Sequence, residues 1–416
     1  MGNINIRNEI NKATMPQRIF VFSMLALWLY TFIALVFTKG QSFYVLLHSD
    51  FDDSFMDFFN SLHDGEYADP YRERGVIYPA FCYLFYKAFS MLLPSSDYYS
   101  AYEWRNQQSG IVVFLGLTVI TCIFLYLILK PAKKHSYLDT VLPILIVLGG
   151  VPFLYAYERG NLILQTVLLI LVFVRFYNSP NKILKELALI SLAAAACMKI
   201  YPALFGYLLI KDKKWKEAGR CILYGMLLFV LPFFYFNGID SIKVMLWNIG
   251  DTGLIMNTRG YGYKVNLENT IGFLEEISGI PIPNLAAMIF MALCVAVVLI
   301  FAKENWKIQA AIASSMILFV DFSYTYTLVY MAVPLIYFFE SRSERKHIDW
   351  FYAALFVGMF APFAFGGYNP FGLDPDVLYP LGLTTVIQSI SLMVFVVTLA
   401  VDTIVNKCSK KAIIKV

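Results

Sequence analysis

Eight carboxylates gather in one short polar segment of a chain that is otherwise mostly apolar. The segment, residues 48–74, reads HSDFDDSFMDFFNSLHDGEYADPYRER, and its acids are Asp50, Asp52, Asp53, Asp57, Asp64, Glu66, Asp69 and Glu73. Aspartates recur at helical spacing along one side of the segment, and aromatic residues lie on the other side. A carboxylate beside a low-dielectric environment can act as a general base toward a hydroxyl group. We therefore predict a short interfacial helix whose acids mostly form a solvated face. Asp52, Asp53 and Asp57, just past the first apolar run, are the carboxylates that could serve as a general base.

A second polar set lies in the turn YERGN, residues 157–161, between two apolar runs. It combines Glu158, Arg159 and Asn161. Charged groups at such a place are costly to insert into a membrane and usually have a purpose, so one interpretation is a ligand-binding role. The alternative is an ion pair between Glu158 and Arg159 that caps a hairpin.

Three other cations are candidates for binding a ligand. Lys199 ends an apolar run in MKIYP, residues 198–202, and is either a snorkelling lysine or a cation aimed at a phosphate. Arg259 and Lys264 lie in NTRGYGYK, residues 257–264. This glycine- and tyrosine-rich segment could close over a ligand or be an ordinary surface loop.

The composition places these residues in a membrane protein. The chain has 416 residues, of which 59% are hydrophobic and 15% charged, and its mean hydropathy is +0.63. Soluble domains are less apolar and more charged. Apolar runs of transmembrane length recur along the chain, and no soluble domain of any size fits between them. The six cysteines form no CxxC or other metal-like spacing, so we expect neither a disulfide framework nor a zinc site.

The distribution of Lys and Arg orients the expected spans, because these residues concentrate in cytoplasmic loops. With both termini in the cytoplasm, the segment 76–94 is best treated as a juxtamembrane or re-entrant helix on the outer face. We then expect an all-α polytopic bundle of about twelve transmembrane helices in one domain, residues 1–416. The expected spans are 19–37, 108–130, 138–156, 161–177, 184–200, 202–211, 217–236, 283–303, 306–323, 326–340, 349–366 and 380–401. Of these, 202–211 is too short for a full crossing, so we expect a broken or tilted helix there.

The long connections of this layout, 38–107 and 237–282, both lie on the outer face, whereas the inner loops are short. Functional residues are commonly carried by long loops on a rigid scaffold. The layout therefore predicts an active site that faces outside.

The order of these motifs resembles that of the GT-C membrane glycosyltransferases, in particular the GT87 or DUF2029 type, which includes polyprenyl-phosphate-mannose-dependent mannosyltransferases. The resemblance spans roughly residues 15–340. Its motifs, in chain order, are the outer aspartate and aromatic helix ending in Gly65, Tyr67 and Tyr71, a YP helix with Tyr78, Pro79 and Pro94, the turn with Gly160 and Asn161, a K-x-YP element with Lys199, Tyr201 and Pro202, a basic loop with Lys213, Lys214 and Trp215, and an element from Asn266 to Thr270.

The resemblance implies an inverting transfer of a monosaccharide from a polyprenyl-phosphate donor to a lipid-linked or cell-surface glycan or glycolipid acceptor. An outer-loop aspartate would be the base, which maps here onto Asp53, with Asp57 as the second candidate. The donor phosphate would meet Lys199, Arg159, Arg259 and Lys264, and the substrates would meet Glu158, Asn161, Tyr78, Asn266 and Tyr324. No cofactor is required, and a divalent cation remains an open alternative. The chain would serve cell-envelope polysaccharide biosynthesis in the plasma (inner) membrane of a bacterium, with membrane lipid and no nucleic acid among its partners.

Two other functions share the polytopic form. An exopolysaccharide or O-antigen polymerase would carry its catalytic arginines in large late outer loops, whereas the richest polar loop here is the first one. A lipid-linked glycan transporter or flippase would place charges near the middle of the spans and often show two similar halves. Few charges lie in the middle of the expected spans, and the sequence shows no convincing repeat, so the enzyme is favoured.

Overall fold

The computed structural model describes residues 12–40, 51–95, 99–131, 135–256, 264–341, 347–364 and 382–413. Within these ranges the regular structure is helical, and the one β-type contact is an isolated bridge between Lys264 and Tyr324. The chain divides into two compact units. The first comprises Met1–Ser49, Leu129–Tyr155 and Arg259–Val416, and the second comprises Asp50–Ile128 and Ala156–Thr258.

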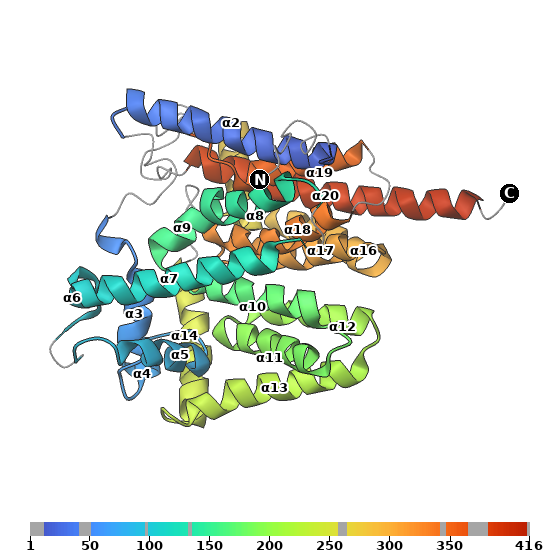
Figure 1. The fold of residues 1–416 in the computed structure, drawn as a ribbon. Helices are drawn as coiled ribbons and strands as arrows, with labels where there is room; N and C mark the ends of the chain where they lie inside the picture. Colours follow the sequence, from blue (N-terminus) through green and yellow to red (C-terminus); the bar gives the residue numbers. More distant parts are fainter. Residues whose placement is uncertain are drawn as a thin grey trace, which may run out of the picture. The chain divides into compact units, whose positions relative to one another are not determined.

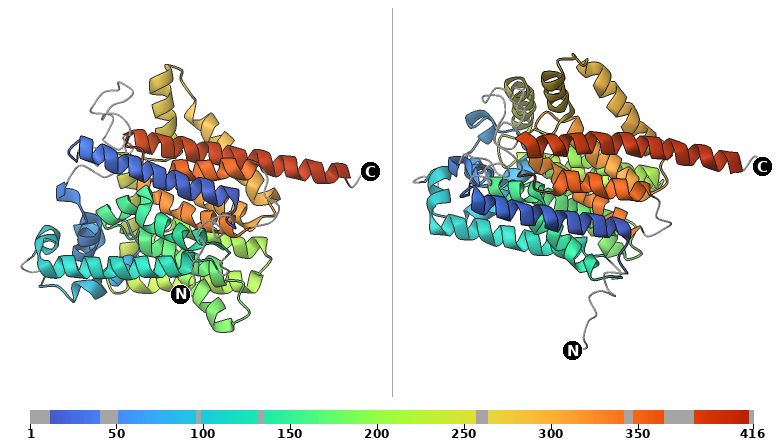
Figure 2. Two further views of the ribbon diagram at one scale, coloured as in Figure 1. Left: turned by 45° about the horizontal axis from the view of Figure 1, so that its top comes forward. Right: turned by 90° about the horizontal axis from the view of Figure 1, so that it is seen from above.

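The first unit is built around helices α2, α19 and α20, which lie side by side in Figures 1 and 2. Phe20 of α2 packs edge-on against Phe339 of α18 and Phe360 of α19. Buried polar contacts tie α2 to α8, where Gln17 Nε2 donates to Asp139 at 2.7 Å. The helices of this unit are α2 (Met15–Phe37), α8 (Leu138–Gly149), the start of α9 (Val151–Arg159), α15 (Leu267–Ser278), α16 (Asn284–Phe301), α17 (Asn305–Leu318), η4 (Thr325–Met331), α18 (Ala332–Glu340), α19 (Ile348–Phe360) and α20 (Gly382–Ile413).

The second unit packs α10, α11 and α13 side by side, with α5 against α3, α11 and α13. Its aromatic core includes Phe58, Phe59 and Trp104 in one cluster and Tyr71 and Phe233 in another. The helices are η2 (Phe51–Asp53), α3 (Met56–Asp64), α4 (Pro70–Glu73), α5 (Ala80–Ser90), α6 (Ala101–Asn106), α7 (Gln108–Leu129), the end of α9, α10 (Ile163–Phe176), α11 (Lys182–Met198), η3 (Tyr201–Gly206), α12 (Tyr207–Lys211), α13 (Trp215–Phe233) and α14 (Ile239–Met256).

Four helices in the described ranges are long and apolar enough to cross a membrane: Met15–Phe37, Gln108–Leu129, Asn284–Phe301 and Leu383–Ser409. Leu138–Gly149 and Val151–Arg159 would add a fifth span if they are taken together, with a bend of 42° between them. The bend follows from Gly150, whose backbone is extended, and from Pro152, which lacks an N–H donor. The chain is therefore a helical membrane protein, but the expected count of about twelve spans is not supported.

The number of spans is lower than expected because several apolar segments fold as helices shorter than a membrane span. Ile163–Phe176 and Ile348–Phe360 are among the apolar helices that are too short for a simple crossing. The expected span 202–211 is a 3₁₀ helix, Tyr201–Gly206, followed by the five-residue α12. In the segment 76–94, α5 has only 11 residues, or about 16 Å at 1.5 Å per residue. That length is too short for a simple crossing.

Candidate active site

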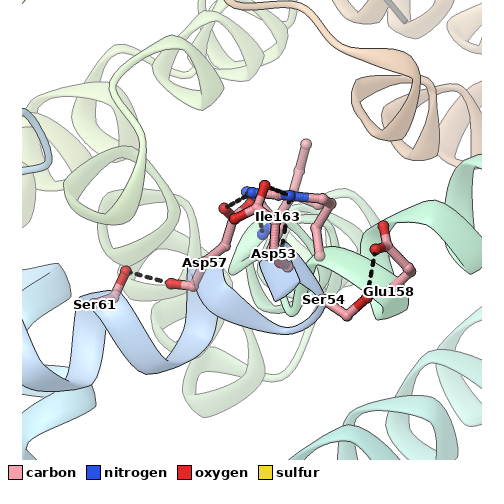
Figure 3. A network of polar contacts seen from close by, with 8 residues as sticks. Asp53, Ser54, Asp57, Ser61, Glu158 and Ile163 are labelled. Atoms are coloured by element: carbon pink, nitrogen blue, oxygen red, sulfur yellow. Dashed lines mark hydrogen bonds and ion pairs between the residues drawn. The ribbon is translucent and has the colours of Figure 1, made fainter. Parts of the chain in front are cut away.

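Arg159, at the end of α9, holds two aspartates of the acidic segment in the second unit. One terminal nitrogen forms an ion pair with Asp53 Oδ2, and the other lies 2.7 Å from Asp57 Oδ1. Asn161 Nδ2 donates to the second oxygen of Asp57, also at 2.7 Å. Figure 3 shows the side chains of Asp53 and Asp57 directed toward the same place. Sequence segments about a hundred positions apart thus form one polar network.

The two aspartates differ in how many of their carboxylate oxygens accept hydrogen bonds. Both oxygens of Asp57 accept hydrogen bonds, one from Arg159 and one from Asn161. Asp53 Oδ2 accepts a hydrogen bond from Arg159, and no residue in the described ranges donates a hydrogen bond to Asp53 Oδ1. The Asp53 side chain is 40% exposed and that of Asp57 is 25% exposed. Asp53 is therefore the carboxylate that retains an accessible lone pair for a proton.

A break in the acidic helix creates this arrangement. The sequence predicts one short helix through both aspartates, but the chain forms η2, then the left-handed residue Phe55 with φ 66°, and only then α3. The Phe55 N–H donates to the Glu158 carbonyl oxygen at 2.7 Å, which fixes the break through a contact distant in sequence. Phe58 and Phe59 of α3 are buried, so the aromatic side faces the core as expected.

Gly160 lets the YERGN turn approach that break. Its φ is +66°, and a Cβ at this position would lie 2.9 Å from Phe58 Cβ and 3.0 Å from the Phe55 carbonyl oxygen. Only glycine combines the left-handed backbone with this close approach. The YERGN turn can therefore pack against the acidic segment only because residue 160 has no side chain.

The side chain of Glu158 contacts the acidic segment and not the side chain of Arg159. Its Oε1 accepts a hydrogen bond from Ser54 Oγ at 3.1 Å, as drawn in Figure 3, and its Oε2 is buried without a hydrogen-bond partner in the described ranges. The alternative of a Glu158–Arg159 ion pair capping a hairpin is thus replaced by contacts from both residues to the segment 53–57. Ser54 belongs to this network although no periodicity or motif in the sequence points to it.

Lys199, the C-cap of α11, lies near the same network in an aromatic enclosure. The residue is only 5% exposed. Its Nζ lies 5.5 Å from the ring centre of Tyr78 and 6.0 Å from that of Tyr201. It donates a hydrogen bond to Tyr201 and interacts electrostatically with Asp57. Burial raises the pKa of Tyr78 to about 12, although Lys199 acts in the opposite direction, so the phenol is protonated at neutral pH.

An apolar cavity of about 530 Å³ lies between α5 and α13 of the same unit. It is lined by Phe81, Leu84, Phe85, Leu227, Leu228, Leu231, Pro232 and Tyr235. Phe81 lies three positions after Tyr78 in the chain. The second unit thus contains both a buried cation and an apolar hollow.

The late candidates form a separate polar cluster in the first unit. Lys264 pairs with Tyr324 in the isolated bridge, and Val265 N donates to Ser323 O at 2.8 Å. Asn266 caps α15 by accepting from Asn269 N at 3.1 Å. The structure thus brings Lys264, Asn266 and Tyr324 together. Arg259 lies outside the described residues.

A further surface group beside Asp53 was missed at the level of sequence. Tyr102 Oη donates to Asp52 Oδ1 at 3.0 Å, and the Arg105 guanidinium stacks 4.3 Å from the centre of the Tyr102 ring. The residues on α6 carry no motif, so only their position next to the acidic segment draws attention to them. Both residues contact Asp52, the neighbour of Asp53 in the chain.

The network is chemically suited to deprotonating a hydroxyl group near an anion. The formal charges of Asp53, Asp57, Arg159 and the nearby Lys199 sum to zero, and Glu158 adds a further acid to the network. Among the described residues no group of three or more His, Cys, Asp or Glu side chains is arranged to hold a metal ion. The geometry thus places carboxylates, which can accept a proton, near a buried cation.

Comparison with known proteins adds one finding. The model of a family described as glycosyltransferase family 87 matches residues 77–320, which is more than half of the chain. No curated protein and no solved structure matches the chain. The matched region contains Tyr78, Arg159, Asn161 and Lys199 and begins after the acidic segment.

Proposed function

The chain belongs to glycosyltransferase family 87 and is a helical membrane protein, and on that premise we propose that it transfers a monosaccharide from a polyprenyl-phosphate donor to a glycan or glycolipid acceptor. The family gives the enzyme class, a membrane glycosyltransferase. The proposal adds the donor, the acceptor, inversion at the anomeric carbon and the residues that act. It also places the site on the outer face of a bacterial inner membrane, in a GT-C-like bundle.

The observation that carries the proposal is the arrangement of two carboxylates on one guanidinium. Asp53 is the general base: its free Oδ1 takes the proton of the acceptor hydroxyl as that oxygen attacks the anomeric carbon. Arg159 and Asn161 hold Asp57, and Arg159 at the same time fixes Asp53. Arg159 is therefore a positioning residue in this proposal, which differs from its expected role in binding the phosphate.

Lys199 meets the leaving group in the same proposal. As the bond between the anomeric carbon and the phosphate oxygen breaks, the lipid phosphate gains a negative charge, and a buried cation stabilises such a charge strongly. The enclosure by Tyr78 and Tyr201 keeps water away from Nζ. The apolar cavity between α5 and α13 fits a hydrocarbon chain whose phosphate lies at Lys199, which supports a lipid-linked donor.

The first experiment is transfer of label from polyprenyl-phosphate sugars to a membrane lipid extract by the purified full chain. Wild type is compared with Asp53→Asn, Asp57→Asn and, as a matched control, Asp240→Asn, an exposed acid of the same unit. We expect wild-type transfer, a loss of roughly 10²–10⁴-fold for Asp53→Asn, a smaller loss for Asp57→Asn and no change for Asp240→Asn. Thermal unfolding of each variant separates loss of the base from loss of the fold.

Two results would contradict the proposal at different levels. Full activity of a folded Asp53→Asn variant would remove Asp53 as the base and leave the enzyme class intact. Consumption of a sugar nucleotide, with no use of any polyprenyl-phosphate sugar, would overturn the donor.

A further inference from the structure

One motif of the chain has no part in the proposed reaction, namely the basic loop before α13. Two turns of the second unit meet there. Tyr177 Oη, which follows α10, donates to Asp212 Oδ2 at 3.0 Å, and Lys214 Nζ donates to Asn178 Oδ1 and lies 5.3 Å from the centre of the Tyr177 ring. These contacts bring the lysines of both turns to one end of the unit. We call this set the basic end; it consists of Lys182, Lys185, Lys213, Lys214 and Lys216.

The acids near the basic end are engaged with other groups. Asp212 accepts from Tyr177 and Asn178. Glu186 pairs with Arg220 and accepts from Tyr224 Oη at 2.8 Å, and Glu217 lies 3.6 Å from Arg220. Lys182, Lys213 and Lys216 are exposed and form no ion pair with any described residue. The positive charge of the basic end is therefore directed outward.

Local backbone preferences oppose lysine at several of these positions. Lys213 has φ 56° in the turn that ends α12, a left-handed conformation that favours glycine. Lys182, Lys185 and Lys216 lie in or next to the first turns of α11 and α13, where the helix dipole disfavours cations. The sequence thus keeps positive charge where neither the turn nor the helices gain from it.

Apolar side chains lie among these lysines and indicate the kind of partner. Trp215, between Lys214 and Lys216, is 63% exposed, and Ile183, next to Lys182, is 71% exposed. An indole flanked by lysines suits the boundary between headgroups and hydrocarbon, where lysines meet anionic lipid. A soluble acidic partner would not require the exposed tryptophan and isoleucine. We infer that the basic end binds the headgroups of anionic phospholipids at the membrane surface.

Thermal unfolding of the full chain in a neutral detergent tests this inference without any use of activity. Phosphatidylglycerol should raise Tm by a few degrees, and equal amounts of phosphatidylcholine or of inorganic phosphate should not. The variant Lys182→Gln/Lys216→Gln should lose most of the rise. The control Lys39→Gln/Lys243→Gln removes two exposed lysines elsewhere and should keep it.

Lys213→Gly provides a second signature. Glycine relieves the left-handed strain, so Tm in phosphatidylcholine should increase, while the additional rise with phosphatidylglycerol should shrink. If Lys213 had only a structural role, Lys213→Gly would change the Tm in phosphatidylcholine but not the additional rise with phosphatidylglycerol. The inference is overturned if both double variants respond equally to phosphatidylglycerol, if Lys213→Gly keeps the full rise, or if inorganic phosphate produces the same shift as the lipid.

Discussion

Arg159 contacts Asp53 and Asp57 at the same time through its two terminal nitrogens, across 106 and 102 positions of the chain. A planar guanidinium can do this because its nitrogens project in a fixed fork, whereas an ammonium is a single point. The relationship makes Arg159 the residue on which the geometry of both carboxylates depends.

Replacing Arg159 by lysine should therefore preserve the positive charge but lose the simultaneous contacts with Asp53 and Asp57. We expect kcat to fall about 10²-fold, the scale on which small misplacements of catalytic groups act, while KM for the donor changes little. Steady-state kinetics with a polyprenyl-phosphate sugar measure both values, and Arg72→Lys, at an exposed arginine of α4, serves as the control. A large rise in donor KM at constant kcat would instead show that Arg159 binds the phosphate.

Lys199 should differ from a base in also affecting donor affinity. In Lys199→Met the apolar stem remains and the charge disappears, so the departing phosphate loses its counter-charge and both kcat and donor affinity should fall. Loss of one such electrostatic group is worth roughly 10²–10³ in kcat. Lys199→Arg should retain part of the activity. Activity of Lys199→Met at the wild-type level, in a folded protein, would remove Lys199 from the mechanism.

Gly160→Ala should destabilise the second unit and disturb the carboxylates. The left-handed backbone alone costs a residue with a Cβ about 1–2 kcal/mol, and the contacts with Phe58 and Phe55 add to that value. A methyl group added at Gly116, within α7, would meet no described atom within 4 Å, so Gly116→Ala should be neutral or stabilising. Thermal unfolding of both variants measures the difference, and equal unfolding temperatures would contradict this account of the turn.

Asn248 of α14 should matter for stability more than its exposure suggests. Its Nδ2 donates to the carbonyl oxygens of Tyr71 and Val76 at 2.8 and 3.0 Å, which holds the segment 71–76 to α14. Asn248→Ala leaves both acceptors without this donor and should cost about 1–3 kcal/mol. Lys243→Ala on the same helix removes only an exposed ion pair with Asp240 and should change stability by less than about 1 kcal/mol. Denaturant unfolding of the two variants gives the comparison.

His63 gives the acidic segment a small pH dependence of stability. Burial lowers the pKa of His63, with Arg74 acting in the same direction and Asp64 and Glu66 opposing. A base whose pKa is lower in the folded state favours unfolding when it becomes protonated, so stability should fall as the pH drops through the ordinary histidine value. The Tm of wild type should therefore decrease more between about pH 7 and pH 5 than that of His63→Gln. Parallel curves would show that His63 does not contribute.

Much of the site was predictable because its parts carry strong local signals. Carboxylates in an apolar chain and a charged turn between apolar runs stand out by composition, and both led to residues that the structure joins. Their pairing was not predictable, since residue types do not give distances across a hundred positions. Arg159 was assigned to a phosphate for that reason, and the structure shows it between two aspartates. The helix break at Phe55 was missed because a backbone hydrogen bond to Glu158 overrides the periodicity.

The membrane class and the helical fold were also predictable, and the family match confirms the resemblance. The number of spans was not. Apolar composition marks a segment as buried or lipid-facing, but it does not show where a helix ends. Residues 161–177 and 349–366 are apolar enough for spans, yet their helices, Ile163–Phe176 and Ile348–Phe360, are shorter than the expected segments.

The balance of charge around Arg159 has a consequence for the end of the reaction cycle. Before the reaction, the formal charges of Asp53, Asp57, Arg159 and Lys199 sum to zero. If Asp53 takes the acceptor proton as proposed, the four groups carry one positive charge at the moment when the lipid phosphate becomes more negative, so the product would be held electrostatically. Return of that proton from Asp53 to water would bring the sum back to zero and weaken the attraction. In such an enzyme turnover would be timed by a deprotonation, and a faster chemical step alone would not increase the rate.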